Sequence, residues 1–149
     1  MNKDVLVRVS GLHIAPEGGT DIPVEVTTRG EYYFKNDRHY LFYEEVAEGF
    51  SGTTKNRVIF SEDRLEITKK GVVNAHLLFE RGNRNSTFYH TPFGNITIGI
   101  DTQSLSLSVE EDRIDVKIRY ALEMNGGLVA NCAISLEVLD CERADFRLA

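Results

Sequence analysis

Apolar and polar residues alternate along most of this 149-residue chain, and the alternation is clearest in the C-terminal third. Every second residue from Ile114 to Met124 is apolar or aromatic, and most of the residues between them are charged. A β-strand turns successive side chains to opposite faces, so this period predicts one buried and one solvated face. Asn125–Gly127 then suits a tight turn, and the alternation resumes from Leu128 to Val138, which predicts a β-hairpin.

The segment before this hairpin has the same period, but its phase changes once. The apolar residues of 96–100 occupy even positions, whereas those of 105–109 occupy odd positions. An extra residue between Gly99 and Gln103 would keep both groups on one face of the sheet. We therefore predict a β-bulge or bend there, as is common where a sheet curls into a barrel.

The N-terminal half predicts further short strands. Valines share one face of a first strand at 5–9, and residues 30–46 predict two strands around a turn at Asn36–Asp37. Three more strands are expected at 53–61, 63–70 and 72–80. A helical period is almost absent, apart from a short segment at 141–146.

Together these segments predict an all-β fold of about eight to ten short antiparallel strands joined by hairpin turns. Closure of the sheet removes the exposed edge strands that promote aggregation, so we favour a single antiparallel meander β-barrel over a flat sandwich. A barrel of about eight strands has room for packed side chains or for one small ligand. The length fits one domain, which we place at residues 1–149.

The composition narrows the functional classes. The formal net charge is -6 and no lysine- or arginine-rich block occurs, so we expect no binding to nucleic acid or to anionic membranes. No apolar run could span a bilayer and residues 1–11 lack the core of a secretory signal, so we expect a cytoplasmic protein with reduced thiols at Cys132 and Cys141. The spacing of histidines and cysteines matches no metal site, and no cofactor motif occurs, so we expect neither metal nor cofactor.

The densest polar and aromatic cluster is Thr87–Ile100, with the sequence TFYHTPFGNITIGI. Pro92 fixes its own φ angle and Gly94 tolerates a positive one, which is typical of a turn between strands. Acid–base catalysis would need a partner beside His90, and the sequence names none. We interpret the stretch as a corner with His90 at its rim.

Glu44 and Glu45 are adjacent in a predicted strand, so one of them faces the barrel interior and the other faces solvent. An inward carboxylate needs a cation or a hydrogen-bond donor, because an unpaired buried charge is very unfavourable. Arg57 and Arg119 are possible partners, and the spacing selects neither. The simpler interpretation, which we favour, is a charged strand end at the barrel mouth.

Three segments carry a likeness to a known family: RGEYYFKNDRHYLFYEE, GVVNAHLLFERGNRNSTFYHTPFG and ITIGIDTQSL. In order and spacing, from about Val5 to Val138, the chain resembles the YwiB-like family of bacterial proteins of unknown function. The resemblance implies a calycin, meaning a lipocalin-like antiparallel β-barrel, and it carries over no substrate or catalytic residue. Lipocalins usually bear G-x-W on the first barrel strand, where this chain has Gly30 and Tyr32 and no tryptophan anywhere.

We therefore predict a non-enzymatic barrel that binds a small, partly apolar molecule inside or at its mouth. The side chains expected to orient this ligand are Tyr32, Tyr43, Glu45, Tyr89 and His90. The alternative is a protein–protein or homodimeric interaction module that uses the outer surface, because 39–46 and 75–80 carry apolar residues on both faces. An enzyme would need Glu44 or Glu45 to meet His90 or an arginine in a wet cavity.

Overall fold

The computed structural model describes residues 3–11, 25–46, 52–92 and 94–141, except for the side chains of 128–130. The described residues form ten strands. These are β1 (Asp4–Ser10), β2 (Glu25–Lys35), β3 (Arg38–Val46), β4 (Thr53–Phe60), β5 (Arg64–Gly71), β6 (Asn74–Glu80), β7 (Arg84–Thr91), β8 (Gly94–Val109), β9 (Arg113–Met124) and β10 (Gly127–Asp140).

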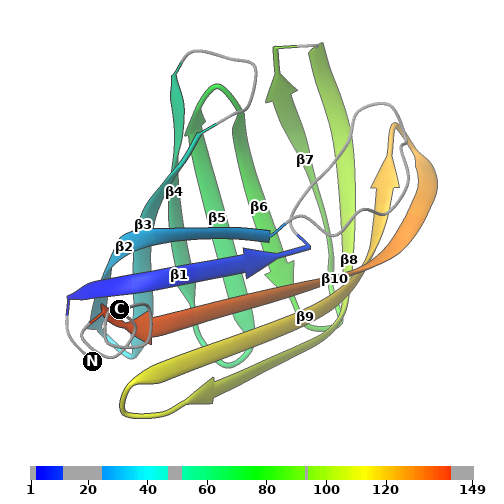
Figure 1. Ribbon diagram of the computed structural model, residues 1–149. Coiled ribbons are helices and arrows are strands. Elements are labelled where there is room, and N and C mark those ends of the chain that lie inside the picture. The colour runs from blue at the N-terminus through cyan, green and yellow to red at the C-terminus, as the bar shows by residue number, and fades with distance from the viewer. Residues whose placement is uncertain (1–2, 12–24, 47–51, 93, 142–149) are drawn as a thin grey trace.

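The ten strands close into one antiparallel barrel (Figure 1). Each strand pairs with its neighbours in chain order, and β1 pairs with both β2 and β10. Val7 of β1 thus lies opposite Thr28 on one side and Val138 on the other. This closure confirms the predicted all-β meander barrel and excludes the flat sandwich.

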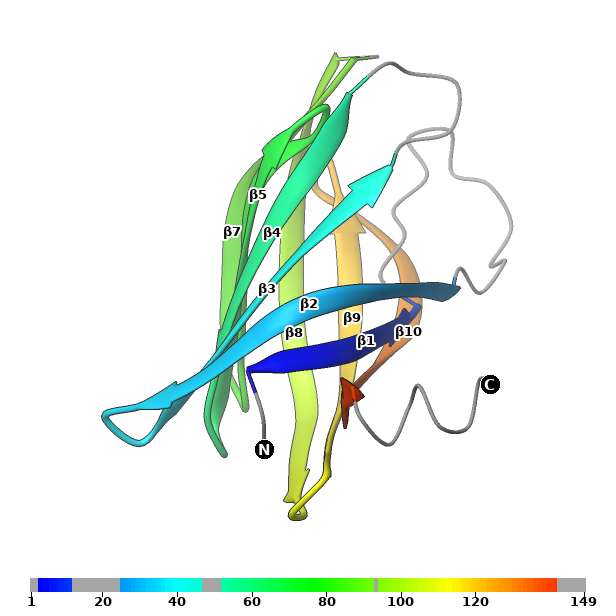
Figure 2. The ribbon, with the colours of Figure 1, turned by 60° about the vertical axis from the view of Figure 1, so that its left-hand side comes forward.

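The barrel has two distinct ends. At one end, which we call the base, lie the turns between β2 and β3, β4 and β5, β6 and β7, and β8 and β9; Figure 2 shows the first and last of these projecting downward. At the other end, which we call the mouth, β3, β5, β7 and β9 finish. Up-and-down connection of neighbouring strands produces this arrangement, because every second turn returns to the same end.

The alternation predicted from the sequence places one face of every strand inside. Val5, Val7 and Val9 are all buried, as expected for the first strand. The largest fully buried side chains include Phe60, Phe79, Leu41, Leu65, Leu77, Ile98 and Ile100. Burial of each such side chain stabilises the fold by roughly 1.5–3 kcal/mol before the entropy cost of folding is counted.

Both predicted hairpin turns are present. Asn36 and Asp37 have φ angles of 52° and 61°, and Asn125 and Gly126 have φ angles of 51° and 86°. Two successive left-handed residues give the turn whose twist matches that of the paired strands, and asparagine, aspartate and glycine adopt it most readily. The corner between β7 and β8 is also confirmed, since β7 ends at Thr91 and β8 begins two residues after Pro92.

The phase change in β8 is a bulge. The pairing of β8 with β9 shifts between Thr102 and Ser104, which leaves Gln103 as the extra residue inside the predicted interval. A second shift, between Leu128 and Ala130 of β10, was not predicted. No phase change marks this shift, because Leu128, Val129 and Ala130 are all apolar and so occupy both even and odd positions.

Other features of the sequence have simpler outcomes. Cys132 and Cys141 both carry thiols in the structure. Within the described ranges, no helix is long and apolar enough to cross a membrane. The helical segment expected at 141–146 lies, beyond its first residue, outside the described residues.

Gly30 of β2 lies where neighbouring strands come unusually close, and this contact can be tested. A Cβ atom at Gly30 would lie 2.6 Å from the carbonyl oxygen of Phe42 and 2.9 Å from Cγ2 of Val7. We expect Gly30→Ala to lower the free energy of unfolding by about 1–3 kcal/mol, because paired strands cannot easily separate to relieve the overlap. Gly127→Ala is the control, since its nearest such contact is Met124 O at 3.8 Å. Urea denaturation measures both, and equal effects would contradict the close packing at Gly30.

Candidate functional site

One row of inward side chains near the mouth is polar, and it is set by the register of five strands. Tyr43 lies opposite Asn56, Asn56 opposite Lys69, Lys69 opposite Ala75, and Ala75 opposite Tyr89. The next row toward the base is buried and apolar, and it contains Leu41, Val58, Ile67 and Leu77. The interior therefore changes from apolar to polar over one step along the strands.

Lys69 is the central charged group of this region. Its side chain is 4% exposed, and Nζ donates hydrogen bonds to Oε1 of Glu45 at 2.9 Å and to Oδ1 of Asn56 at 2.8 Å. The Glu45 side chain is 29% exposed, so the ion pair reaches from the interior toward solvent. A buried ammonium group is tolerable only with such partners. We call Tyr43, Glu45, Asn56, Lys69 and Tyr89 the mouth cluster.

The two tyrosines of the mouth cluster remain neutral phenols at pH 7. Burial raises the pKa of Tyr43 and of Tyr89, and the negative charge of Glu45 raises both further, that of Tyr89 to about 12. Both residues are at least nine-tenths buried, yet among the described residues neither hydroxyl has a hydrogen-bond partner. These two hydroxyls can therefore orient the polar part of a ligand or of a bound water.

The structure brings together three of the five residues proposed from the sequence. Tyr43, Glu45 and Tyr89 belong to the mouth cluster. Tyr32 also faces inward but lies near the base, because it is only four residues from the β2–β3 turn, and its hydroxyl is 2.6 Å from Nδ1 of His39. His90 follows the inward Tyr89 and is exposed on the outer face, where its Nδ1 lies 2.7 Å from Oδ1 of Asn95.

The orientation of the two adjacent glutamates is now settled. Glu45 faces the interior and Glu44 is exposed. The partner of Glu45 is Lys69, so the suggestion of Arg57 or Arg119 is wrong. Both arginines alternate with buried residues of their own strands and are exposed outside. His90 pairs with neither glutamate: Glu45 faces the interior, and the β3 strand of Glu44 is separated from the β7 strand of His90 by β4, β5 and β6.

Sequence reasoning missed Lys69 and Asn56, although the phase of their strands contains the signal. In β5 the buried residues Leu65 and Ile67 are followed at the same spacing by Lys69. In β4 Asn56 likewise precedes Val58 and Phe60 on the inward face. A lysine or asparagine that continues an apolar phase predicts a polar group inside the barrel.

The fold and these residues define a closed ten-stranded barrel with a polar mouth, and comparison with known proteins places it in a family. The chain belongs to the family described as "Domain of unknown function (DUF1934)", whose model matches residues 7–136. It is 24% identical over 124 residues to the uncharacterized beta-barrel protein YwiB of Bacillus subtilis (strain 168), which covers 83% of this chain and 86% of that protein.

A solved structure shows the same fold. The crystal structure of the ywiB protein from Bacillus subtilis matches with a TM-score of 0.74 at 21% sequence identity, covering 93% of this chain and 91% of that one. The family resemblance and the β-barrel are thereby confirmed. The relation to calycins and the cytoplasmic location stay predictions.

The outer surface also has an exposed aromatic region, of which only Phe42 belongs to the segments 39–46 and 75–80 that motivate the alternative interaction hypothesis. Tyr33, Phe34 and Phe42 of the β2–β3 hairpin are 40%, 59% and 36% exposed. The rings of Tyr33 and Phe42 pack edge to face, with centroids 6.0 Å apart. Whether this surface contacts another chain stays a prediction of the sequence.

The Lys69–Glu45 pair predicts an asymmetric response to mutation. Glu45→Ala leaves the ammonium of Lys69 buried with only Asn56, so we expect the free energy of unfolding to fall by about 3 kcal/mol. Lys69→Met should cost less, because it removes the buried charge and leaves a carboxylate that water already reaches. Urea denaturation at pH 7 measures both. Glu44→Ala, an exposed neighbour, should stay within about 0.5 kcal/mol. A larger loss from Lys69→Met than from Glu45→Ala would contradict the observed burial of the pair.

Proposed function

We propose that this protein binds a small, partly apolar molecule at the mouth of the barrel, with the polar head of the ligand on the mouth cluster. The observation that carries the proposal is Lys69, a lysine 4% exposed that Glu45 and Asn56 hold inside the barrel wall. Ligand sites in barrels typically combine an apolar lining with a few convergent polar groups. The polar row above the apolar row of Leu41, Val58 and Ile67 supplies this combination.

The chemistry of the mouth cluster favours an uncharged polar head. An ammonium group carries three donors, and Glu45 and Asn56 take two of those of Lys69. The third donor and the hydroxyls of Tyr43 and Tyr89 suit a carbonyl, amide or hydroxyl oxygen. Because Lys69 and Glu45 neutralise each other, a net charge on the ligand would find no complementary charge in the cluster.

Binding, rather than catalysis, is what these groups support. A general base works best with a pKa near the working pH, and the phenol of Tyr89 has a pKa of about 12. The carboxylate of Glu45 is held by Lys69, and His90 is on the outer face. The mouth cluster thus offers fixed hydrogen-bonding groups in place of a proton-transfer pair.

The proposal is tested by thermal shift against a library of small metabolites that pairs uncharged amides, ketones and alcohols with the corresponding carboxylates. We expect the uncharged members to raise the melting temperature more. For the best ligand, Tyr43→Phe and Tyr89→Phe should each weaken binding by about 2–10-fold, the value of one hydrogen bond.

Tyr40→Phe is the matched control, because Tyr40 lies on β3 between inward positions and faces outward. It should leave the affinity unchanged. A library in which no compound raises the melting temperature, or a ligand whose affinity is unaffected in both Tyr43→Phe and Tyr89→Phe, would contradict binding at the mouth.

A further inference from the structure

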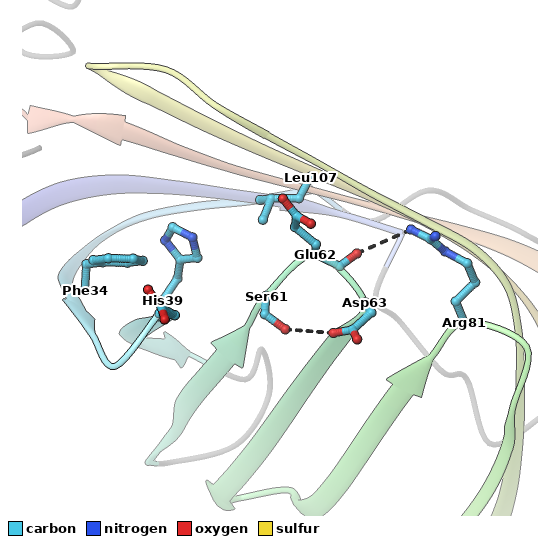
Figure 3. A pocket seen from close by; sticks show the side chains of 8 residues that line it. Phe34, His39, Ser61, Glu62, Asp63, Arg81 and Leu107 are labelled. Carbon is cyan, nitrogen blue, oxygen red and sulfur yellow. Dashed lines mark hydrogen bonds between the residues drawn. The ribbon is translucent and has the colours of Figure 1, made fainter.

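A cavity of about 550 Å³ lies at the base, at the opposite end of the barrel from the mouth cluster (Figure 3). The β2–β3, β4–β5 and β6–β7 turns surround it, and Leu107 of β8 contributes an apolar side. Its lining shares no residue with the mouth cluster. The cavity is therefore a separate feature of the fold and needs its own explanation.

His39 forms one wall of this base cavity and is held rigidly. It is 7% exposed, its ring stacks on Phe60 with centroids 4.8 Å apart, and Phe34 packs on it at the same distance. The hydroxyl of Tyr32 is 2.6 Å from Nδ1 of His39. Rings packed in this way keep one orientation, so any group that His39 offers to the cavity is pre-positioned.

The Tyr32–His39 pair leaves Nε2 of His39 for a ligand. Burial raises the pKa of Tyr32 and lowers the pKa of His39, so both side chains are neutral at pH 7. The phenol can donate to Nδ1 of His39 or accept from it, so Nε2 carries the imidazole proton in the first tautomer and a lone pair in the second. Among the described residues, no side chain or backbone group bonds to Nε2, and His39 lines the cavity.

The rim of the base cavity is acidic. Asp37, Glu62 and Asp63 line it, and Arg81 is the single cation among its lining residues. The guanidinium of Arg81 donates to the backbone oxygen of Glu62 at 3.3 Å (Figure 3) and to that of Leu105 at 2.7 Å, so it connects the β4–β5 turn to β8. Three carboxylates against one engaged guanidinium leave an excess of negative charge around the opening.

The base cavity also has an exposed aromatic ring in its lining. Phe34 is 59% exposed and lines the same cavity. The face of an aromatic ring attracts cations, and an apolar or flat group can pack on it. An aromatic ring, three carboxylates and the imidazole of His39 together suit a ligand that is cationic and has a flat apolar group.

We propose that the base cavity is a second ligand site that takes an organic cation, an amine or guanidinium joined to a flat apolar group. The apolar group packs against Phe34 and Leu107, and the positive charge lies among Asp37, Glu62 and Asp63. Nε2 of His39 hydrogen-bonds to the ligand or to a bridging water. This site would act independently of the mouth cluster.

The test uses the full chain and two probes of the same shape, phenethylamine and the uncharged 2-phenylethanol. Two-dimensional amide NMR titrations should show the amine shifting resonances of 34–39 and 61–63 while those of the mouth cluster stay unchanged. We expect 2-phenylethanol to bind at least about tenfold more weakly, as one lost charge-assisted interaction implies.

Variants distinguish a built site from general attraction to an acidic protein. Asp37→Asn/Glu62→Gln should weaken amine binding about tenfold or more, and asparagine tolerates the φ angle of 61° at position 37. Glu44→Gln removes an exposed carboxylate elsewhere and should have no effect. Equal binding of the two probes, equal effects of the two charge changes, shifts confined to the mouth cluster, or no binding of either probe in the low-millimolar range would each overturn the proposal.

Discussion

The pairing of β1 with both β2 and β10 is the constraint on which the remaining structure depends. It gives every strand two neighbours and converts the alternation of apolar and polar residues into an inside and an outside. In this register Val5 lies opposite Gly30, and Gly30 lies opposite Tyr43, the first residue of the polar row near the mouth. In an open sheet, Lys69 and Glu45 would stand in water and would form no more than a weak surface ion pair.

The interior polar groups are not explained by stability alone. Replacement of a buried ion pair by well-packed apolar residues is often neutral or stabilising. The proposed ligand site would give Lys69, Asn56 and Glu45 a role beyond stability. The two ends of the barrel also differ in their chemistry. The mouth cluster is neutral overall and rich in hydrogen-bond donors, whereas the base cavity is acidic and aromatic.

The sequence predicted those features that arise within one strand or one turn. The period of two located the strands, Asn36–Asp37 and Asn125–Gly127 located hairpins, and the phase change located the bulge at Gln103. Contacts between strands could not be predicted, because they depend on register. Lys69 and Glu45 are 24 residues apart in the chain and come into contact only in the folded barrel. Tyr32 lies near the base, beside His39, because the β2–β3 turn follows it closely. Three proposed site residues converge because their strands all end at the mouth.

Closure itself is tested most directly by interstrand nuclear Overhauser effects along β1. The account predicts backbone contacts across both of its edges, from Val7 to Thr28 of β2 and from Val7 to Val138 of β10, with slow amide exchange along both ladders. Contacts across one edge only, together with rapid exchange along the other, would show an open sheet. The interior, the mouth cluster and the base cavity would then lose their physical basis.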